Sequence, residues 1–232
     1  MPFRLQKNSL KRVSSLNLDR MKALTAKYIQ GIENLSQEGI FDALCATEEH
    51  RINCINWAEF PYAPQVSFHI AFSDKVLAVC FKVTEDHVQA FSLESNGPVW
   101  EDSCVEFFIK NPVGEGYYNF EMNCIGTMLA AKRRSRTDAD HFDEEQMKQI
   151  RNFGSIEHRT INIEARNQYW WRVELIPFSL IGLNESPGTL HGNFYKCGDK
   201  CSKPHFLSWS EIDTPSPSFH CPEFFGDILL KK

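Results

Sequence analysis

The stretches SCVEFFIK (103–110) and YYNFEMNCIG (117–126) flank the loop NPVGEG (111–116), and together they predict a β-hairpin. The loop contains one proline and two glycines, as is typical of a connection between antiparallel strands. If Lys110 pairs with Tyr117, one face of the hairpin carries apolar side chains, and its cross-strand pairs are Val105–Met122, Phe107–Phe120 and Ile109–Tyr118. This register predicts a strand pair with one face in the core.

The opposite face of the same hairpin places Glu106 directly across from Glu121. Two carboxylates in such a pair repel each other. We therefore expect the pair either to be solvated or to be offset by a cation, a shared proton, ligand hydroxyls or a neighbour such as Arg172. The remaining pairs of this face are Phe108–Asn119 and Cys104–Asn123.

The whole chain predicts an all-β fold, a sandwich of two antiparallel sheets. Its 18 phenylalanines and its many short period-two stretches favour this class. A serine cap and helical spacing predict one short N-terminal helix within residues 36–50. The mostly polar composition of residues 131–159 predicts a long excursion from the sheets, here called the polar excursion, with a short helix near 143–151. Further strands are predicted at 22–29, 51–57, 66–72, 76–83, 162–166, 169–177, 192–196, 206–210 and 225–230.

Length and composition limit the classes of protein that this chain can be. Its 232 residues suit one domain (21–232) preceded by a basic N-terminal arm (1–20). The net charge of −5 argues against a general nucleic-acid binder, and no apolar run is long enough to suggest a membrane partner. No secretion signal is visible, so the chain as numbered is expected in the cytoplasm. A different start would allow a periplasmic or secreted protein.

Eight cysteines are scattered along the chain, and most are expected to be reduced and structural. Cys197 and Cys201 are close enough for a zinc site with His205, His220 or Cys221, or for a disulfide with each other. The intervening GDK reads equally well as a turn, so no metal ligand is assigned.

Enzymatic function is the less favoured alternative. Neither a serine nucleophile elbow, nor a phosphate loop, nor a dinucleotide fingerprint is visible. Glu106 and Glu121 could approach the separation of about 5 Å found in retaining glycoside hydrolases. However, the sequence shows no separate substrate domain, and we therefore expect a non-catalytic protein.

Three motifs resemble those of the family 9 carbohydrate-binding modules of xylanases and their DOMON-like relatives. WEDSCVEFF (100–108) resembles the family's W-E-x-D-S-V-E-x-F stretch. LSWS (207–210) resembles its S-W-S strand, and FHCPEFFG (219–226) resembles its closing aromatic turn. Their order and spacing also fit. The resemblance covers roughly residues 45–232, and the polar excursion matches poorly.

The resemblance implies a fold that holds sugars, often at their reducing ends, between two aromatic rings. Trp100 falls on the position of one ring, and Phe219 falls on the other, where a tryptophan is expected. Glu106 falls on a carboxylate that bonds sugar hydroxyls. Glu121 falls where the xylanase modules carry an arginine, so this chain departs from the family by replacing a Glu–Arg pair with a Glu–Glu pair.

We therefore expect a protein that binds mono- or oligosaccharides in polysaccharide utilisation, with a glycoside hydrolase as a potential partner. Aromatic rings suit the apolar face of a sugar, and carboxylates suit its hydroxyl rim. No cofactor is required, although the resemblance implies structural calcium at Glu101, Asp102 or the Glu106/Glu121 pair. The main rival is the same fold serving as a metal-binding or scaffold protein. The predicted sugar-binding residues are Trp100, Glu106, Glu121, Asn123, Tyr195 and Phe219.

Overall fold

The computed structural model describes residues 22–232, so the predicted basic arm (1–20) lies outside the described residues. The strands are β1 (Ala23–Tyr28), β2 (His50–Arg51), β3 (Cys54–Ile55), β4 (Gln65–Phe72), β5 (Val76–Ala90), β6 (Cys104–Lys110), β7 (Tyr117–Asn123), β8 (Met128–Arg133), β9 (Ala139–His141), β10 (Arg151–Gly154), β11 (Ile161–Pro177), β12 (Thr189–Cys197), β13 (Phe206–Ser208) and β14 (Gly226–Lys231). The helical segments are η1 (Ile32–Asn34), α2 (Gln37–Cys45), η2 (Val99–Glu101), α3 (Glu144–Met147), η3 (Phe178–Ile181) and η4 (Pro222–Phe224). Within residues 22–232, none of these helices is long and apolar enough to cross a membrane.

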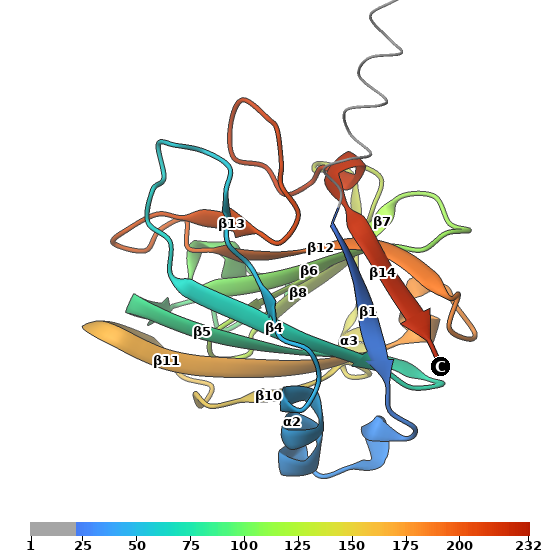
Figure 1. Ribbon diagram of the computed structural model, residues 1–232. Coiled ribbons are helices and arrows are strands. Elements are labelled where there is room, and N and C mark those ends of the chain that lie inside the picture. Colours follow the sequence, from blue (N-terminus) through green and yellow to red (C-terminus); the bar gives the residue numbers. More distant parts are fainter. Residues whose placement is uncertain (1–21) are drawn as a thin grey trace, which may run out of the picture.

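The strands form one continuous mixed sheet (Figure 1). Its main path runs β10-β11-β5-β4-β1-β14-β12-β6-β7-β8-β9. The chain was predicted to form two separate antiparallel sheets, and the structure differs because β1 pairs in parallel with both β4 and β14. This N-terminal strand joins the part of the sheet that contains β4, β5 and β11 to the part that contains β12, β6 and β7. The predicted all-β character is confirmed.

The predicted register of the β6–β7 hairpin is confirmed. Val105 pairs with Met122, and Phe107 pairs with Phe120. These side chains belong to the main buried cluster, which sits between the β4–β5 part of the sheet and the β6–β7–β12 part. Because side chains alternate along a strand, the same register turns Glu106 to the opposite face.

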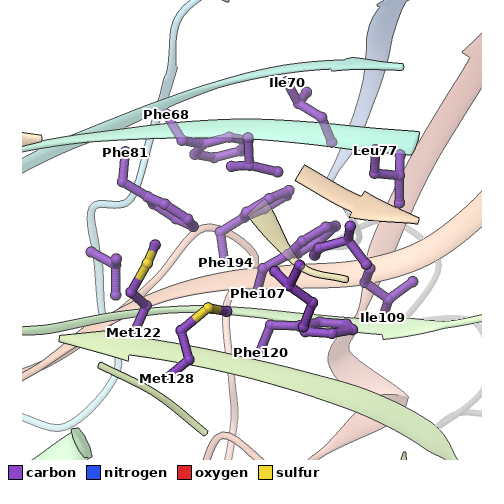
Figure 2. Close-up of a cluster of buried hydrophobic side chains, with 14 of the residues drawn as sticks. Phe68, Ile70, Leu77, Phe81, Phe107, Ile109, Phe120, Met122, Met128 and Phe194 are labelled. Atoms are coloured by element: carbon purple, nitrogen blue, oxygen red, sulfur yellow. The ribbon is translucent and has the colours of Figure 1, made fainter. Parts of the chain in front are cut away.

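Stacked aromatic rings from both parts of the sheet occupy the centre of the core (Figure 2). The Phe194 ring of β12 lies 3.7 Å from Phe68 of β4 and 4.3 Å from Phe107 of β6, measured between centroids. Phe194 is fully buried. This stack holds β4 against β6 and β12, although these strands are far apart along the sheet.

The predicted N-terminal helix is confirmed as α2. The Ser36 hydroxyl accepts a hydrogen bond from the Gly39 amide at 3.1 Å and caps the first turn. Ile40 and Leu44 are buried in a separate cluster with residues of β5 and β11. The helix therefore covers the face of these strands that points away from the main core (Figure 1).

The polar excursion is more ordered than its composition predicts. Residues 131–159 contain the end of β8 and all of β9, α3 and β10. A capping box starts α3, in which Asp143 and Gln146 bond each other's backbone amides. The strands predicted at 162–166 and 169–177 form one strand, β11, with a shift in register between Glu164 and Gln168.

Replacing Phe194 with alanine should lower the free energy of unfolding by about 3–5 kcal/mol, because the side chain is fully buried between two rings. Phe91→Ala is a matched control, since 55% of Phe91 is exposed; its effect should stay within roughly 0.5 kcal/mol. Urea unfolding measures both. An equal loss in the two variants would contradict the central position of Phe194.

Candidate functional site

A cavity of about 240 Å³ lies on the face of β6, β7 and β12 that points away from the main core. Its floor comes from four neighbouring strands, which contribute Glu106 of β6, Glu121 of β7, Arg133 of β8 and Cys197 of β12. Loops and η2 supply the walls. The full lining is Trp100, Glu106, Glu121, Arg133, Arg136, Cys197, Asp199, Phe206, Pro217, Ser218, Phe219 and His220.

The predicted Glu106–Glu121 pair lies on this floor. The two residues are cross-strand partners, and each is only 3% exposed, so the pair is not a solvated surface feature. Burial raises the pKa of Glu121 to about 7. Burial, and then the charge of Glu121, raise the pKa of Glu106 well above its usual range. The pair therefore retains at least one proton at neutral pH.

The cation near this pair is Arg133, and the prediction of Arg172 was wrong. The Nε of Arg133 donates to Asn119 Oδ1 at 2.8 Å, and Asn119 Nδ2 donates to Glu121 Oε1 at 2.7 Å. This relay and the charge of Arg133 both oppose the effect of burial on the pKa of Glu121. Arg172 instead donates to Asn152 Oδ1 and to the Ile156 carbonyl.

The two predicted aromatic rings line the cavity, and they differ in exposure. Trp100 lies on η2 with 37% of its surface exposed, whereas Phe219 is 8% exposed. Tyr195 is fully buried, and its ring stacks on Phe219 with centroids 4.2 Å apart and an interplanar angle of 5°. Its hydroxyl donates to the Phe219 carbonyl. Tyr195, predicted as a sugar contact, is thus placed behind the ring that lines the cavity.

Asn123, the remaining predicted residue, is fully buried and is not among the residues that line the cavity. Its Nδ2 donates to the Ser92 carbonyl and to Asp102 Oδ2, and its Oδ1 accepts from the Thr127 amide. Asp102 immediately follows η2, which carries Trp100. Asn123 therefore helps to position the segment that bears Trp100.

Several lining residues were not predicted. Arg133 and Arg136 belong to the run RRSR (133–136), which the sequence suggested was a solvated surface. Asp199 lies in the GDK turn after β12, and burial raises its pKa to about 6. Burial lowers the pKa of His220 to about 3, so this ring stays neutral beside the Tyr117 hydroxyl, 2.9 Å from its Nδ1. The features of the sequence that could have indicated these lining residues were the run of arginines and the aspartate in the turn.

The metal ligands suggested by the sequence are not brought together as a set. His205 Nε2 lies 2.8 Å from Lys196 Nζ, and its Nδ1 lies 2.8 Å from the Lys203 carbonyl, so both ring nitrogens have partners. All eight cysteines are free thiols. Among residues 22–232, the group with metal-ligand spacing is Cys104, Glu106 and Cys197.

The residues implied for calcium fit that ion poorly. Asp102 accepts from the Phe91 and Ser92 amides, one at each carboxylate oxygen. Glu101 pairs with Lys200 at 2.8 Å. Calcium requires six to eight oxygen ligands, whereas the Glu106/Glu121 pair has thiols beside it. We therefore derive no role for calcium.

Comparisons with known proteins agree with the three sequence motifs. Residues 40–230 match the model of carbohydrate-binding family 9. A protein of Bacteroides uniformis ATCC 8492 that is proposed to bind carbohydrate has 34% identity and a TM-score of 0.86, covering 91% of this chain and 100% of its own. No curated protein shows significant similarity to the chain.

Two further solved structures share the fold at low identity. Both are of a family 9 carbohydrate-binding module from Caldicellulosiruptor kristjanssonii. The complex with glucose has 14% identity and a TM-score of 0.56, covering 90% of this chain and 96% of the module. The complex with cellotriose has 13% identity and a TM-score of 0.57, covering 90% and 94%. The match over residues 40–230 shows that this chain belongs to carbohydrate-binding family 9.

Proposed function

We propose that the chain binds a mono- or oligosaccharide without transforming it, at the cavity between Trp100 and Phe219. The observation that carries this proposal is an exposed tryptophan beside a cavity whose floor holds two buried carboxyl groups. Such a combination suits a molecule with an apolar face and a rim of hydroxyl groups. Sugars have this character.

Each part of the cavity has a distinct task in this proposal. Trp100 provides the platform on which a sugar ring stacks, and Phe219 limits the cavity on another side. Glu106 and Glu121 bond hydroxyl groups at the floor. Asp199 and Arg136 are additional polar groups within the same lining. Tyr195 contributes indirectly by stacking on Phe219.

The size of the cavity indicates how much sugar it can take. At about 240 Å³, it is smaller than the roughly 300–1,000 Å³ typical of drug-sized ligands. We therefore propose that it takes one terminal ring, such as the reducing end of a chain, while the rest of an oligosaccharide lies outside. Affinity is expected to be weak because little area is buried. We further propose that the chain acts beside a glycoside hydrolase in polysaccharide utilisation.

Hydrolysis by Glu106 and Glu121 is the alternative function. A glycoside hydrolase needs one carboxyl to stay ionised as nucleophile or base while the other supplies a proton. Burial raises the pKa of both groups here, which leaves neither clearly ionised at neutral pH. This pattern favours hydrogen bonding over catalysis. Release of an aryl group from aryl glycosides would revive the alternative.

Trp100→Ala should abolish sugar binding while leaving the fold intact, because the side chain is partly exposed and provides the stacking surface. Thermal unfolding in a panel of glucose, xylose, galactose and their disaccharides measures binding, since a ligand of the folded state raises the midpoint by mass action. Tyr169→Ala is the matched control because Tyr169 is an exposed aromatic of β11 outside the cavity lining. An unchanged shift in Trp100→Ala, or no shift with any sugar, would contradict the proposal.

Glu121→Gln should weaken the decline of stability as the pH rises. Burial raises the pKa of Glu121 from 4.5 to about 7, so the folded chain binds a proton that the unfolded chain has released. The resulting stabilisation is complete below pH 4.5 and is lost as the pH rises through about 7. Urea unfolding from roughly pH 5 to 8 measures this slope.

Glu174→Gln is the control for this pH dependence. Glu174 is also buried, which raises its pKa to about 8, but it is not among the residues that line the cavity. Its removal should flatten the decline at higher pH than the removal of Glu121 does. Identical slopes for the wild type and Glu121→Gln would show that Glu121 titrates normally in the folded chain.

A further inference from the structure

Two thiols and a carboxyl group meet at one end of the cavity floor. Cys104 of β6 and Cys197 of β12 are cross-strand partners. Glu106 lies two residues after Cys104 and therefore projects from the same face of β6. The Sγ atoms and a carboxylate oxygen of these three residues all lie within 4.8 Å of one another. Cys197 Sγ lies 3.1 Å from Glu106 Oε1.

This group is buried next to a second carboxyl group, that of Glu121. Cys104 and Cys197 are almost completely buried, and Glu106 faces Glu121 across the β6–β7 ladder. The guanidinium of Arg133 is connected to Glu121 by hydrogen bonds through Asn119. Burying two facing carboxyl groups is costly unless protons or a cation offset their charge. A cation that binds thiolates would offset the charge of these carboxyl groups and would also bind the two cysteines.

The ligand types select the class of cation. Calcium and magnesium prefer oxygen ligands, whereas zinc accepts cysteine sulfur together with carboxylate oxygen. In a tetrahedral site with Zn–S bonds near 2.3 Å, two sulfur ligands lie about 3.8 Å apart. The three ligand atoms lie within 4.8 Å of one another, so the distances between them need to shorten by no more than about 1 Å to form such a site.

Two of the three ligands are accessible from the cavity, and the third, Cys104, lies directly behind them. Glu106 and Cys197 line the cavity, so an ion can reach them from solvent without opening the core. The three ligands come from two paired strands, so the backbone holds them on one side of the metal position. A fourth coordination position, on the cavity side, would be open to water or to a ligand hydroxyl, as in zinc sites with three protein ligands.

We propose that Cys104, Glu106 and Cys197 bind one thiophilic divalent metal ion, of which zinc is the type, at the floor of the cavity. Binding displaces the thiol protons of Cys104 and Cys197 and the proton that Glu106 holds, and all of these protons are released to solvent. The site differs from the implied calcium in its chemistry, since two of its three ligands are thiols, although it shares Glu106 with the Glu106/Glu121 pair. It also places a cation next to Glu121.

Metal binding by the full-length, reduced chain tests this proposal directly. The protein is stripped with a chelator, dialysed, and equilibrated with zinc in the presence of excess calcium, and bound metal is measured by elemental analysis. One zinc per chain is expected. Cobalt in place of zinc should give a thiolate-to-cobalt charge-transfer band, which oxygen ligands alone cannot produce. Displacement of zinc by calcium, or absence of bound zinc, would overturn the proposal.

Variants identify the ligands. Cys104→Ser and Cys197→Ser should each lose the charge-transfer band and stoichiometric zinc, whereas Cys54→Ser, which removes a partly buried thiol of β3 outside the group, should retain both. A fourth variant, Glu106→Gln, tests the third ligand, because it removes the carboxylate while keeping both thiols and the shape of the side chain. Circular dichroism confirms that each variant is folded. Equal binding by Cys54→Ser and the two thiol variants would mean adventitious metal only. Sugar titrations of the metal-free protein report on the proposed function separately.

Discussion

The register of β6 between β7 and β12 is the constraint on which both the core and the cavity depend. Phe107 faces the stacked rings of the core, and Glu106, one residue earlier, faces the cavity. A shift of one residue would exchange these two faces, placing a carboxyl in the core and a phenyl ring on the floor. The stack of Phe194 against Phe68 and Phe107 therefore does more than stabilise the fold. It fixes which side chains the cavity presents.

The floor of the cavity brings two carboxyl groups face to face, and their charge must be offset. The resemblance implies an arginine at the position of Glu121, which would neutralise Glu106 across the ladder. Here a guanidinium comes instead from Arg133 on β8, and Asn119 connects it to Glu121. The positive charge thus lies on the strand next to that of Glu121, and protons held by the two carboxyls offset the remaining charge. A floor that retains protons can donate as well as accept hydrogen bonds.

The sequence predicted what is local and missed what depends on distant segments. The β6–β7 register followed from alternation and a short loop, and the rings at Trp100 and Phe219 followed from the motif resemblance. The parallel pairing of β1 with β4 and β14 carries no local pattern, so the joining of the sheet could not be predicted. Arg133 lay in a charged run that is typical of a solvated surface. Only the addition of β8 beside β7 brings it to the floor.

Tyr195 and Asn123 were predicted to contact a sugar, and the structure gives the polar groups of both residues partners within the protein. Both are polar residues on the cavity side of the sheet, which suggested that they touch a ligand. In the structure their polar groups are engaged with the protein itself: Tyr195 holds Phe219 from behind, and Asn123 bonds Asp102 beside the segment that carries Trp100. Tyr195 thus packs directly against the Phe219 ring, whereas Asn123 holds Asp102, the residue that follows the segment of Trp100. A ring that is already held in place loses less conformational entropy on binding, so these two residues can influence affinity without contacting a ligand.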